Sequence, residues 1–383
     1  MKNAMLIAAV LLLMLTSACS PKEQAKIDTP APQTAAPAEA TPAPTKAPLS
    51  SETPEATIGI TPKPIPSPTV EPKGIDAATV SKDRILRLLK KDPATLTDNE
   101  IAFLGSLYGE LTLETCEIEN VEALKYATML TGLELPWNKI KNAEPLSHIT
   151  GLKHLNLYDN KISDIASLGS LINLVKLDVG DNRIKSVCFD GGFDSLETLY
   201  MHSNGLHDFK VVNKLPSLKT LIISWNNISD IKGICKIDSL VVLELAINNI
   251  SDITPLKNLS NLEEAFLDEN KISDISVLAE LKKLKVITLE NNRIQNISPL
   301  SLLTNLEYLE LAYNPVQDFS PLKGLKMLKY IEIDSECLGV KGLDTLTYVK
   351  NIKIWGIEFD WDLLEALKSK LPNCKIKYVV LDY

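Results

Sequence analysis

Four histidines and 49 acidic residues are the groups of this 383-residue chain that could do acid–base or metal chemistry. The histidines are His148, His154, His202 and His207, and no HExxH, GxSxG, GxGxxG or P-loop pattern occurs in the chain. His154 and His202 fall two rungs apart in the repeat described below, roughly 10 Å, which is too far to share one metal ion. We therefore predict no catalytic site, no metal site, no cofactor and no enzymatic activity.

The six cysteines do not form a disulfide scaffold, because they are too few for a chain of this length. Five of them show no CxxC spacing, and we interpret these as buried thiols. A disulfide between Cys337 and Cys374 is an open alternative. The five are Cys116, Cys188, Cys235, Cys337 and Cys374.

The body of the chain repeats with a period of 22 residues. Around each repeated asparagine the pattern is LxxLxLxxNxI, and an aliphatic residue recurs five and eight positions later in most units. Cys116 and Glu336 stand one step beyond the two ends of the series. Self-similarity at such a period is typical of solenoid proteins. The asparagines in register are Asn138, Asn160, Asn182, Asn204, Asn226, Asn248, Asn270, Asn292 and Asn314.

The pattern predicts the role of each part of a repeat. L-x-L alternates with period two, so it predicts a short strand with one buried and one exposed face in a parallel sheet. The asparagine amide can both donate and accept, and we expect it to satisfy backbone groups where the chain turns inward. One repeat cannot bury its leucines alone, so stacking on its neighbours supplies the stability.

A short return segment is expected on the convex side. Pro145, Pro255, Pro299 and Pro321 each follow an asparagine by seven residues, which suits the first turn of a helical segment. An aspartate recurs four residues after the asparagine, and we interpret it as a turn cap rather than as part of a calcium ladder. These aspartates are Asp164, Asp208, Asp230, Asp252, Asp274 and Asp318.

The 22-residue repeat resembles the leucine-rich repeat of the bacterial internalins, a family that allows Cys at the asparagine site, as at Cys116. The resemblance covers residues 111–338, close to eleven turns. It implies an α/β fold, namely a right-handed leucine-rich-repeat solenoid with a parallel concave sheet. It also implies adhesion or surface recognition as the function.

A solenoid needs capped ends. We assign residues 75–110 to a helical N-terminal cap, with an amphipathic helix over 80–91 and a second helix starting within 96–100. Residues 339–383 are assigned to an α/β C-terminal cap, with a helix over 360–371 and a last strand over 375–381. The weakest repeat contains Gly191-Gly192, where we predict a bulge on the convex side whose role is open.

The exposed strand positions carry the strongest functional signal. Four positions per turn, those six, four, two and one residues before the asparagine, hold eight of the 21 aromatic residues over eleven turns. They also hold fourteen acidic residues and a single base, Lys176. Exposed aromatics on a sheet are typical of interaction hot spots, and a field of one sign steers partners of the opposite sign. Cross-strand packing and solubility are the structural alternatives.

We predict an exposed apolar patch near the middle turns, with acidic residues on either side. The patch, called the central patch below, consists of Tyr200, Ile222, Trp225, Val242, Ile247 and Phe266. The predicted protein-binding surface also includes Glu244, Asp268, Tyr308 and Tyr330. The expected partner is a basic protein with an apolar anchor.

Residues 1–19 have the form of a secretory signal, with a basic start, an apolar run and small residues before Cys19. The run is too short to span a bilayer permanently. Small residues directly before a cysteine resemble the bacterial lipoprotein box, which implies that Cys19 is lipidated; an ordinary signal peptide is the alternative. Residues 20–74 hold thirteen of the 22 prolines, and we predict a disordered linker there.

These features predict a protein that is anchored by a lipid to the outer face of the bacterial cell membrane and binds another protein through its concave face. A cell-wall or carbohydrate-binding module, with aromatics stacked on sugar rings, is the second interpretation. The net charge of −9 argues against nucleic acid as a partner. The partner's identity and the oligomeric state are not predicted.

Overall fold

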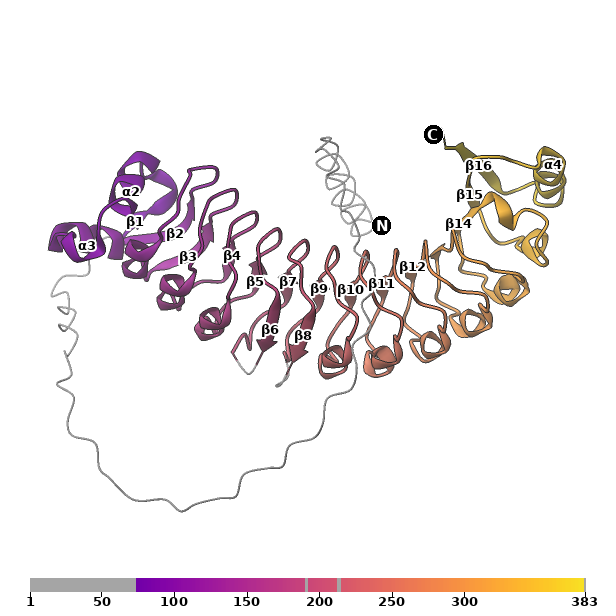
Figure 1. Ribbon diagram of the computed structural model, residues 1–383, viewed down its shortest axis with the longest axis horizontal. Coiled ribbons are helices and arrows are strands. Elements are labelled where there is room, and N and C mark those ends of the chain that lie inside the picture. Colours follow the sequence, from indigo (N-terminus) through magenta and orange to yellow (C-terminus); the bar gives the residue numbers. More distant parts are fainter. Residues whose placement is uncertain (1–73, 190–191, 212–214, 382–383) are drawn as a thin grey trace, which may run out of the picture. The chain divides into compact units, whose positions relative to one another are not determined.

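The computed structural model describes residues 74–189, 192–211 and 215–381 (Figure 1). The predicted signal peptide, the predicted lipidation site Cys19 and nearly all of the predicted linker lie outside these residues. Among the described residues, no helix is both long and apolar enough to cross a membrane.

In the described part of the chain, fourteen strands form one continuous parallel sheet. Figure 1 shows these strands following one another in sequence order along one side of the repeats. Eleven of them belong to the repeats and the strand before them: β2 (Leu107–Thr112), β3 (Leu130–Glu134), β4 (His154–Asn156), β5 (Lys176–Asp178), β7 (Thr198–Tyr200), β9 (Thr220–Ile222), β10 (Val242–Glu244), β11 (Glu264–Phe266), β12 (Val286–Thr288), β13 (Tyr308–Glu310) and β14 (Tyr330–Asp334).

Each short strand is the predicted L-x-L segment, and its register follows from the repeat. Leu243 of β10 pairs with Leu221 of β9 and with Ala265 of β11, both 22 residues away. The same offset relates the paired residues of β5 and β7 and those of β13 and β14. The protein is therefore a right-handed leucine-rich-repeat solenoid, as the sequence predicted.

A ladder of buried asparagine side chains holds the turns that follow the strands. The Oδ1 atom of Asn270 accepts the N–H of Ile250, 20 residues upstream, at 2.9 Å. Its Nδ2 group lies within hydrogen-bond distance of the carbonyl oxygens of Leu245, Leu267 and Asp268. All nine asparagines in register make the equivalent bond to the N–H 20 residues upstream, and each is 6–8% exposed. The predicted double role of the amide is confirmed.

The return segments on the convex side are short 3-10 turns. The predicted capping is confirmed at five of the six aspartates, as in Asp252, whose carboxylate accepts the N–H of Thr254; the side chain of Asp208 lies outside the described residues. The turns are η3 (Glu122–Tyr126), η4 (Glu144–His148), η5 (Ala166–Ser170), η6 (Lys232–Lys236), η7 (Thr254–Asn258), η8 (Ser276–Glu280), η9 (Ser298–Leu302) and η10 (Ser320–Gly324).

Two consecutive repeats differ on this side. In place of 3-10 turns they form β6 (Ser186–Phe189) and β8 (Asp208–Val211), which pair in parallel as a separate sheet. Part of the predicted bulge, Gly191, lies outside the described residues. Gly192 has φ +73° and packs so closely on Gly169 that a Cβ atom would lie 2.0 Å from the Gly169 carbonyl oxygen.

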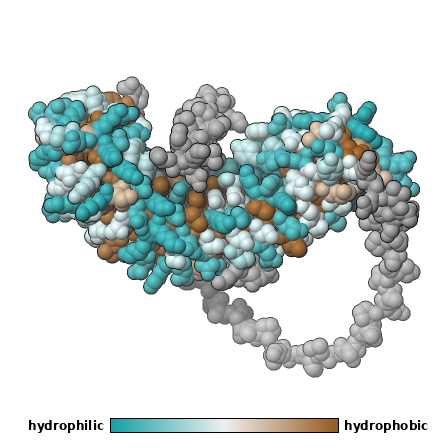
Figure 2. Space-filling model, turned by 180° about the vertical axis from the view of Figure 1, so that it is seen from behind, coloured by the Kyte–Doolittle hydropathy of each residue, from teal (hydrophilic) through white to brown (hydrophobic). Residues whose placement is uncertain are grey.

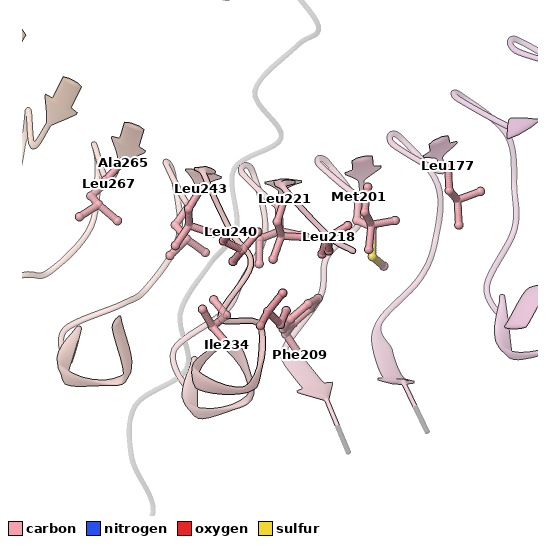
Figure 3. Close-up of a cluster of buried hydrophobic side chains, with 14 of the residues drawn as sticks. Leu177, Met201, Phe209, Leu218, Leu221, Ile234, Leu240, Leu243, Ala265 and Leu267 are labelled. Carbon is pink, nitrogen blue, oxygen red and sulfur yellow. The ribbon is translucent and has the colours of Figure 1, made fainter. Parts of the chain in front are cut away.

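The core is one continuous stack of aliphatic side chains between the sheet and the convex turns. Figure 3 shows a section in which Leu221, Leu243 and Leu267 from the sheet side lie over Phe209 and Ile234 from the convex side. All five side chains are 0–3% exposed. On the side seen in Figure 2, hydrophobic residues reach the surface in small patches among hydrophilic ones.

Both caps extend the sheet. The N-terminal cap contains β1 (Ile75–Asp76), η1 (Ala77–Thr79), α2 (Lys82–Leu89), η2 (Pro93–Thr95) and α3 (Asp98–Gly105). After the last repeat come η11 (Ser335–Cys337), η12 (Leu343–Thr345), β15 (Asn351–Gly356), α4 (Trp361–Lys370) and β16 (Lys375–Val380). The helices and the last strand lie where the sequence predicted them. Helix α3 begins with a capping box between Thr97 and Glu100.

Removal of one ladder amide should destabilise the solenoid. We expect Asn270→Ala to lower the free energy of unfolding by ~2–4 kcal/mol, because it leaves buried backbone groups without partners. The matched control is Asn249→Ala. The side-chain oxygen of Asn249 accepts a hydrogen bond from Lys271 at the surface. Urea denaturation measures both, and equal losses would contradict the ladder's role.

Candidate protein-interaction surface

Two rows of outward-facing residues cross the sheet. Val242 of β10 lies in one row, between Thr220 and Glu264. In the other row, strand pairing places four predicted site residues side by side on β7, β9, β10 and β11: Tyr200, Ile222, Glu244 and Phe266. The fold therefore brings together five residues that are spread over 67 positions of the sequence.

This part of the surface is more buried than we predicted. Ile222 and Phe266 are each only 8% exposed, whereas Tyr200, Val242 and Glu244 are half-buried. In a stacked sheet, neighbouring side chains of the same row cover one another. The expectation that Ile222 and Phe266 are exposed anchors is therefore wrong, and these two side chains form the floor of the central patch.

The exposed part of the patch comes from the turns that follow the strands. Trp225 is 52% exposed, and Ile247 on the next turn is half-buried. The N–H of Trp225 donates to Ala246 at 3.0 Å, and the N–H of Asn226 donates to Ile247 at 3.2 Å. These bonds place Trp225 and Ile247 on neighbouring turns, three residues beyond Ile222 and Glu244 in sequence.

Both residues adopt a left-handed backbone conformation, with φ 56° at Trp225 and φ 55° at Ile247. Asparagine and aspartate tolerate this region, but for residues with bulky or β-branched side chains it costs roughly 1–2 kcal/mol. The conformation recurs directly before the ladder asparagine in nine successive turns, at Trp137, Asp159, Asp181, Ser203, Trp225, Ile247, Glu269, Asn291 and Tyr313. Trp225 and Ile247 therefore stand at a position that asparagine or aspartate would occupy at a lower conformational cost.

Tyr308 and Tyr330 form a second cluster, three strands from Val242 along the same row. Their rings stack in parallel with centroids 4.4 Å apart. The Tyr308 hydroxyl donates to Glu310, and the Tyr330 hydroxyl donates to Glu332 at 2.5 Å. The predicted binding surface is therefore divided into the central patch and this tyrosine cluster.

Crowded carboxyl groups lie between the two parts. Burial is the main cause that raises the pKa of Glu310 to about 8, and the charges of Asp268, Glu332 and Glu290 contribute to this increase. Burial and then the charge of Asp268 raise the pKa of Glu290 to about 7. Burial also raises the pKa of Asp268 to about 6, although the N–H of Glu290 donates to its carboxylate at 2.8 Å.

Some of these carboxyl groups are therefore protonated near neutral pH. The formal count of fourteen acidic residues and one base overstates the negative charge of the face over β11 to β13. A cation that approaches favours the ionised forms, because opposite charge lowers a carboxyl pKa.

Sequence reasoning missed the contribution of the C-terminal cap. Lys353 of β15 pairs with Glu332 of β14, continuing the row that contains Glu310. Its ammonium group lies 3.1 Å from the Glu332 carboxylate and 3.8 Å from the centroid of the Trp355 ring. Lys353 follows Glu332 by 21 residues rather than 22, so it falls outside the 22-residue register of the repeat.

His202 is the other residue whose setting was missed. It is 5% exposed, and its ring fills the space over Gly180, where a Cβ atom would lie 2.4 Å from the imidazole. Burial lowers the pKa of His202, against the opposing charge of Asp178. A glycine two residues before the ladder asparagine Asn182 is the sequence signal for this packing.

Metal or disulfide chemistry finds no support in the described residues. They contain no group of three or more His, Cys, Asp or Glu placed to hold a metal ion. The five cysteines there are free thiols, so the Cys337–Cys374 disulfide is not formed. Burial raises the pKa of Cys337 to about 12 and that of Cys374 to about 11.

Comparison with known families identifies the repeat. The family model described as "Leucine Rich repeats (2 copies)" matches residues 150–191 and 260–302. The family model described as "Leucine Rich repeat" matches residues 214–231. No curated protein sequence matches the chain significantly.

Solved structures share the fold at low sequence identity. An internalin (inlF) from Listeria monocytogenes has a TM-score of 0.54 at 24% identity, covering 79% of this chain and 94% of that one. The leucine-rich repeat protein LIC12759 of Leptospira interrogans has a TM-score of 0.55 at 20% identity, covering 79% and 87%. TLR13 in complex with ssRNA13 has a TM-score of 0.58 at 21% identity, covering 77% of this chain and 49% of that one.

Relief of the left-handed strain should stabilise the protein. We expect Ile247→Asn to raise the free energy of unfolding by ~0.5–1 kcal/mol, because asparagine tolerates positive φ and the buried area lost is small. Thermal and urea denaturation measure the change. A loss of more than about 1 kcal/mol would show that Ile247 is a packing residue instead.

The raised carboxyl pKa values predict a pH-dependent stability. A carboxyl group whose pKa is raised on folding favours the folded state at low pH, and this contribution is lost as pH rises from about 4.5 to about 8. We therefore expect the free energy of unfolding of Glu310→Gln, relative to that of wild type, to be higher at pH 8.5 than at pH 5. The expected difference is at least ~1 kcal/mol, since one pKa unit is worth ~1.4 kcal/mol. Glu280→Gln, at an exposed position of η8, is the control, and parallel pH profiles of wild type and Glu310→Gln would refute the prediction.

Proposed function

We propose that this protein is a non-enzymatic, internalin-like surface protein that binds another protein through the concave face of its repeats. Lipidation at Cys19 would anchor it to the outer face of the bacterial cell membrane, and the proline-rich residues 20–74 would act as the spacer. Fold alone does not define a ligand, so the proposal rests on the surface itself.

The observation that carries the proposal is the pair of bulky residues held at left-handed turns over a buried apolar floor. Trp225 is 52% exposed although it stands where asparagine would fold more easily, and Ile247 continues the apolar surface on the next turn. Aromatic residues at the centre of a preformed surface are typical interaction hot spots. The sheet and the ladder fix this surface in advance, so binding orders few groups.

The carboxyl groups beside the patch support a basic partner. Glu244 lies between Ile222 and Phe266 in the row, and burial raises its pKa. Asp268, Glu290 and Glu310 continue the acidic surface toward the C-terminal end. A partner with an apolar side chain near lysine or arginine fits both features, because its charge favours the ionised carboxylates.

Carbohydrate binding is the second candidate, and the exposed ring of Trp225 favours it, since an aromatic face can stack on a sugar. Tyr308 and Tyr330 support it less, because each ring already covers a face of the other. Cell-wall fragments and free sugars as competitors separate the two candidates.

We expect the double variant Trp225→Asn, Ile247→Asn to lose partner binding by at least ~10-fold while keeping its stability, since loss of a hot-spot residue costs ~2 kcal/mol or more. The measurement is capture by the immobilised full chain from bacterial extracts, host-cell extracts and cell-wall fragments, followed by the affinity of the captured molecule. Trp137→Asn is the matched control, because Trp137 has the same residue type, φ 55° and 50% exposure four turns away.

A protein that is retained by wild type and by Trp137→Asn, and lost from the double variant, would support the proposal. Capture of wall fragments alone, with release by free sugar, would favour the carbohydrate module. Equal capture by all three chains would refute a role of the central patch.

A further inference from the structure

The asparagine ladder ends at Asn314, and the backbone changes there. In the eight preceding turns, the N–H before the ladder asparagine donates to a backbone carbonyl 21 residues downstream, as from Asn291 to Ala312. At Tyr313 the N–H donates instead to the carboxylate of Asp334, at 2.7 Å. The next residue in register is Glu336, which has no amide to continue the ladder.

A cavity of about 950 Å³ lies at this junction between the last repeat and the C-terminal cap. Figure 1 shows the junction where β14 is followed by β15 and β16. Its apolar lining includes Tyr313, 40% exposed and at φ 56°, and Ile357, 50% exposed. Trp355 of β15 lines it as well and is half-buried. We call this space the end cavity.

The charges around the end cavity have one sign. Asp334, Glu336 and Glu358 line it, and no lysine, arginine or histidine does. Asp334 is 5% exposed and uses its carboxylate to accept the N–H groups of Tyr313 and Glu336. Glu336 and Glu358 are exposed at the rim. Lys353 lies over the Trp355 ring and pairs with Glu332.

We propose that the end cavity is a second docking site, which takes an aliphatic or aromatic side chain of a peptide segment that carries lysine or arginine on either side. The apolar side chain would lie against Tyr313, Trp355 and Ile357. The flanking cations would meet the carboxylates of Glu336 and Glu358, which gives the charge complementarity that selects this peptide over an acidic one. The site is four turns from Trp225 and does not depend on the central patch.

The test uses the full chain and two synthetic peptides, acetyl-Lys-Leu-Leu-Lys-amide and acetyl-Glu-Leu-Leu-Glu-amide, in isothermal titration calorimetry. We expect the basic peptide to bind with a Kd on the order of 0.1–1 mM and the acidic peptide not to bind. Glu336→Lys with Glu358→Lys should weaken the basic peptide at least 10-fold. Ile357→Asn, a change at an exposed position, should weaken it as well.

Three controls make the outcome decisive. Asp194→Lys with Glu280→Lys changes the net charge equally at exposed positions elsewhere and should leave binding unchanged. Trp225→Asn with Ile247→Asn removes the central patch, so basic-peptide binding that survives in this double variant belongs to the end cavity, and failure of the proposed function and failure of this site are distinguishable. Thermal denaturation verifies that each variant is folded. Equal binding of both peptides, no binding of the basic one, or equal loss in the charge control would overturn the proposal.

Discussion

The hydrogen bonding of the buried asparagine side chains is the constraint on which the rest of the structure depends. Each amide in the ladder satisfies an N–H of the repeat before it and lies against carbonyl oxygens of its own turn and an earlier one, so neighbouring repeats are tied in a fixed register. Buried backbone groups without partners are costly, so the chain turns the same way after every strand. The parallel sheet, the stacked leucines and the regular rows of exposed residues follow from that register.

The ladder also determines where binding residues can stand. It fixes the preceding residue in a left-handed conformation whatever its type, so each turn presents one side chain at the edge of the sheet. Trp137, Trp225, Ile247 and Tyr313 occupy this position at a conformational cost that the ladder offsets. Where the ladder ends, Asp334 replaces the backbone acceptor of Tyr313, and the end cavity lies beside it.

Most of the fold was predictable, because it follows from spacing. The 22-residue period set the strands, the ladder and the turn caps such as Asp252, and the helical spacing of the caps located α2 and α4. The burial of Phe266 and Ile222 was not predictable, because it depends on which side chains cover them from neighbouring strands. The raised pKa of Glu310 and the contact of Lys353 with Glu332 likewise depend on distances between repeats, which a single repeat pattern does not contain.

The central claim is that Trp225 and Ile247, at two of the left-handed turn positions, are kept for recognition and not for folding. The most direct test is a scan in which each non-asparagine residue at these nine positions is replaced by asparagine, with the free energy of unfolding and the partner affinity measured for every variant. The account predicts that stability is kept or raised at each turn, and that affinity falls at Trp225 and Ile247 without a matching loss of stability. Affinity losses that follow losses of stability along the whole series would contradict it.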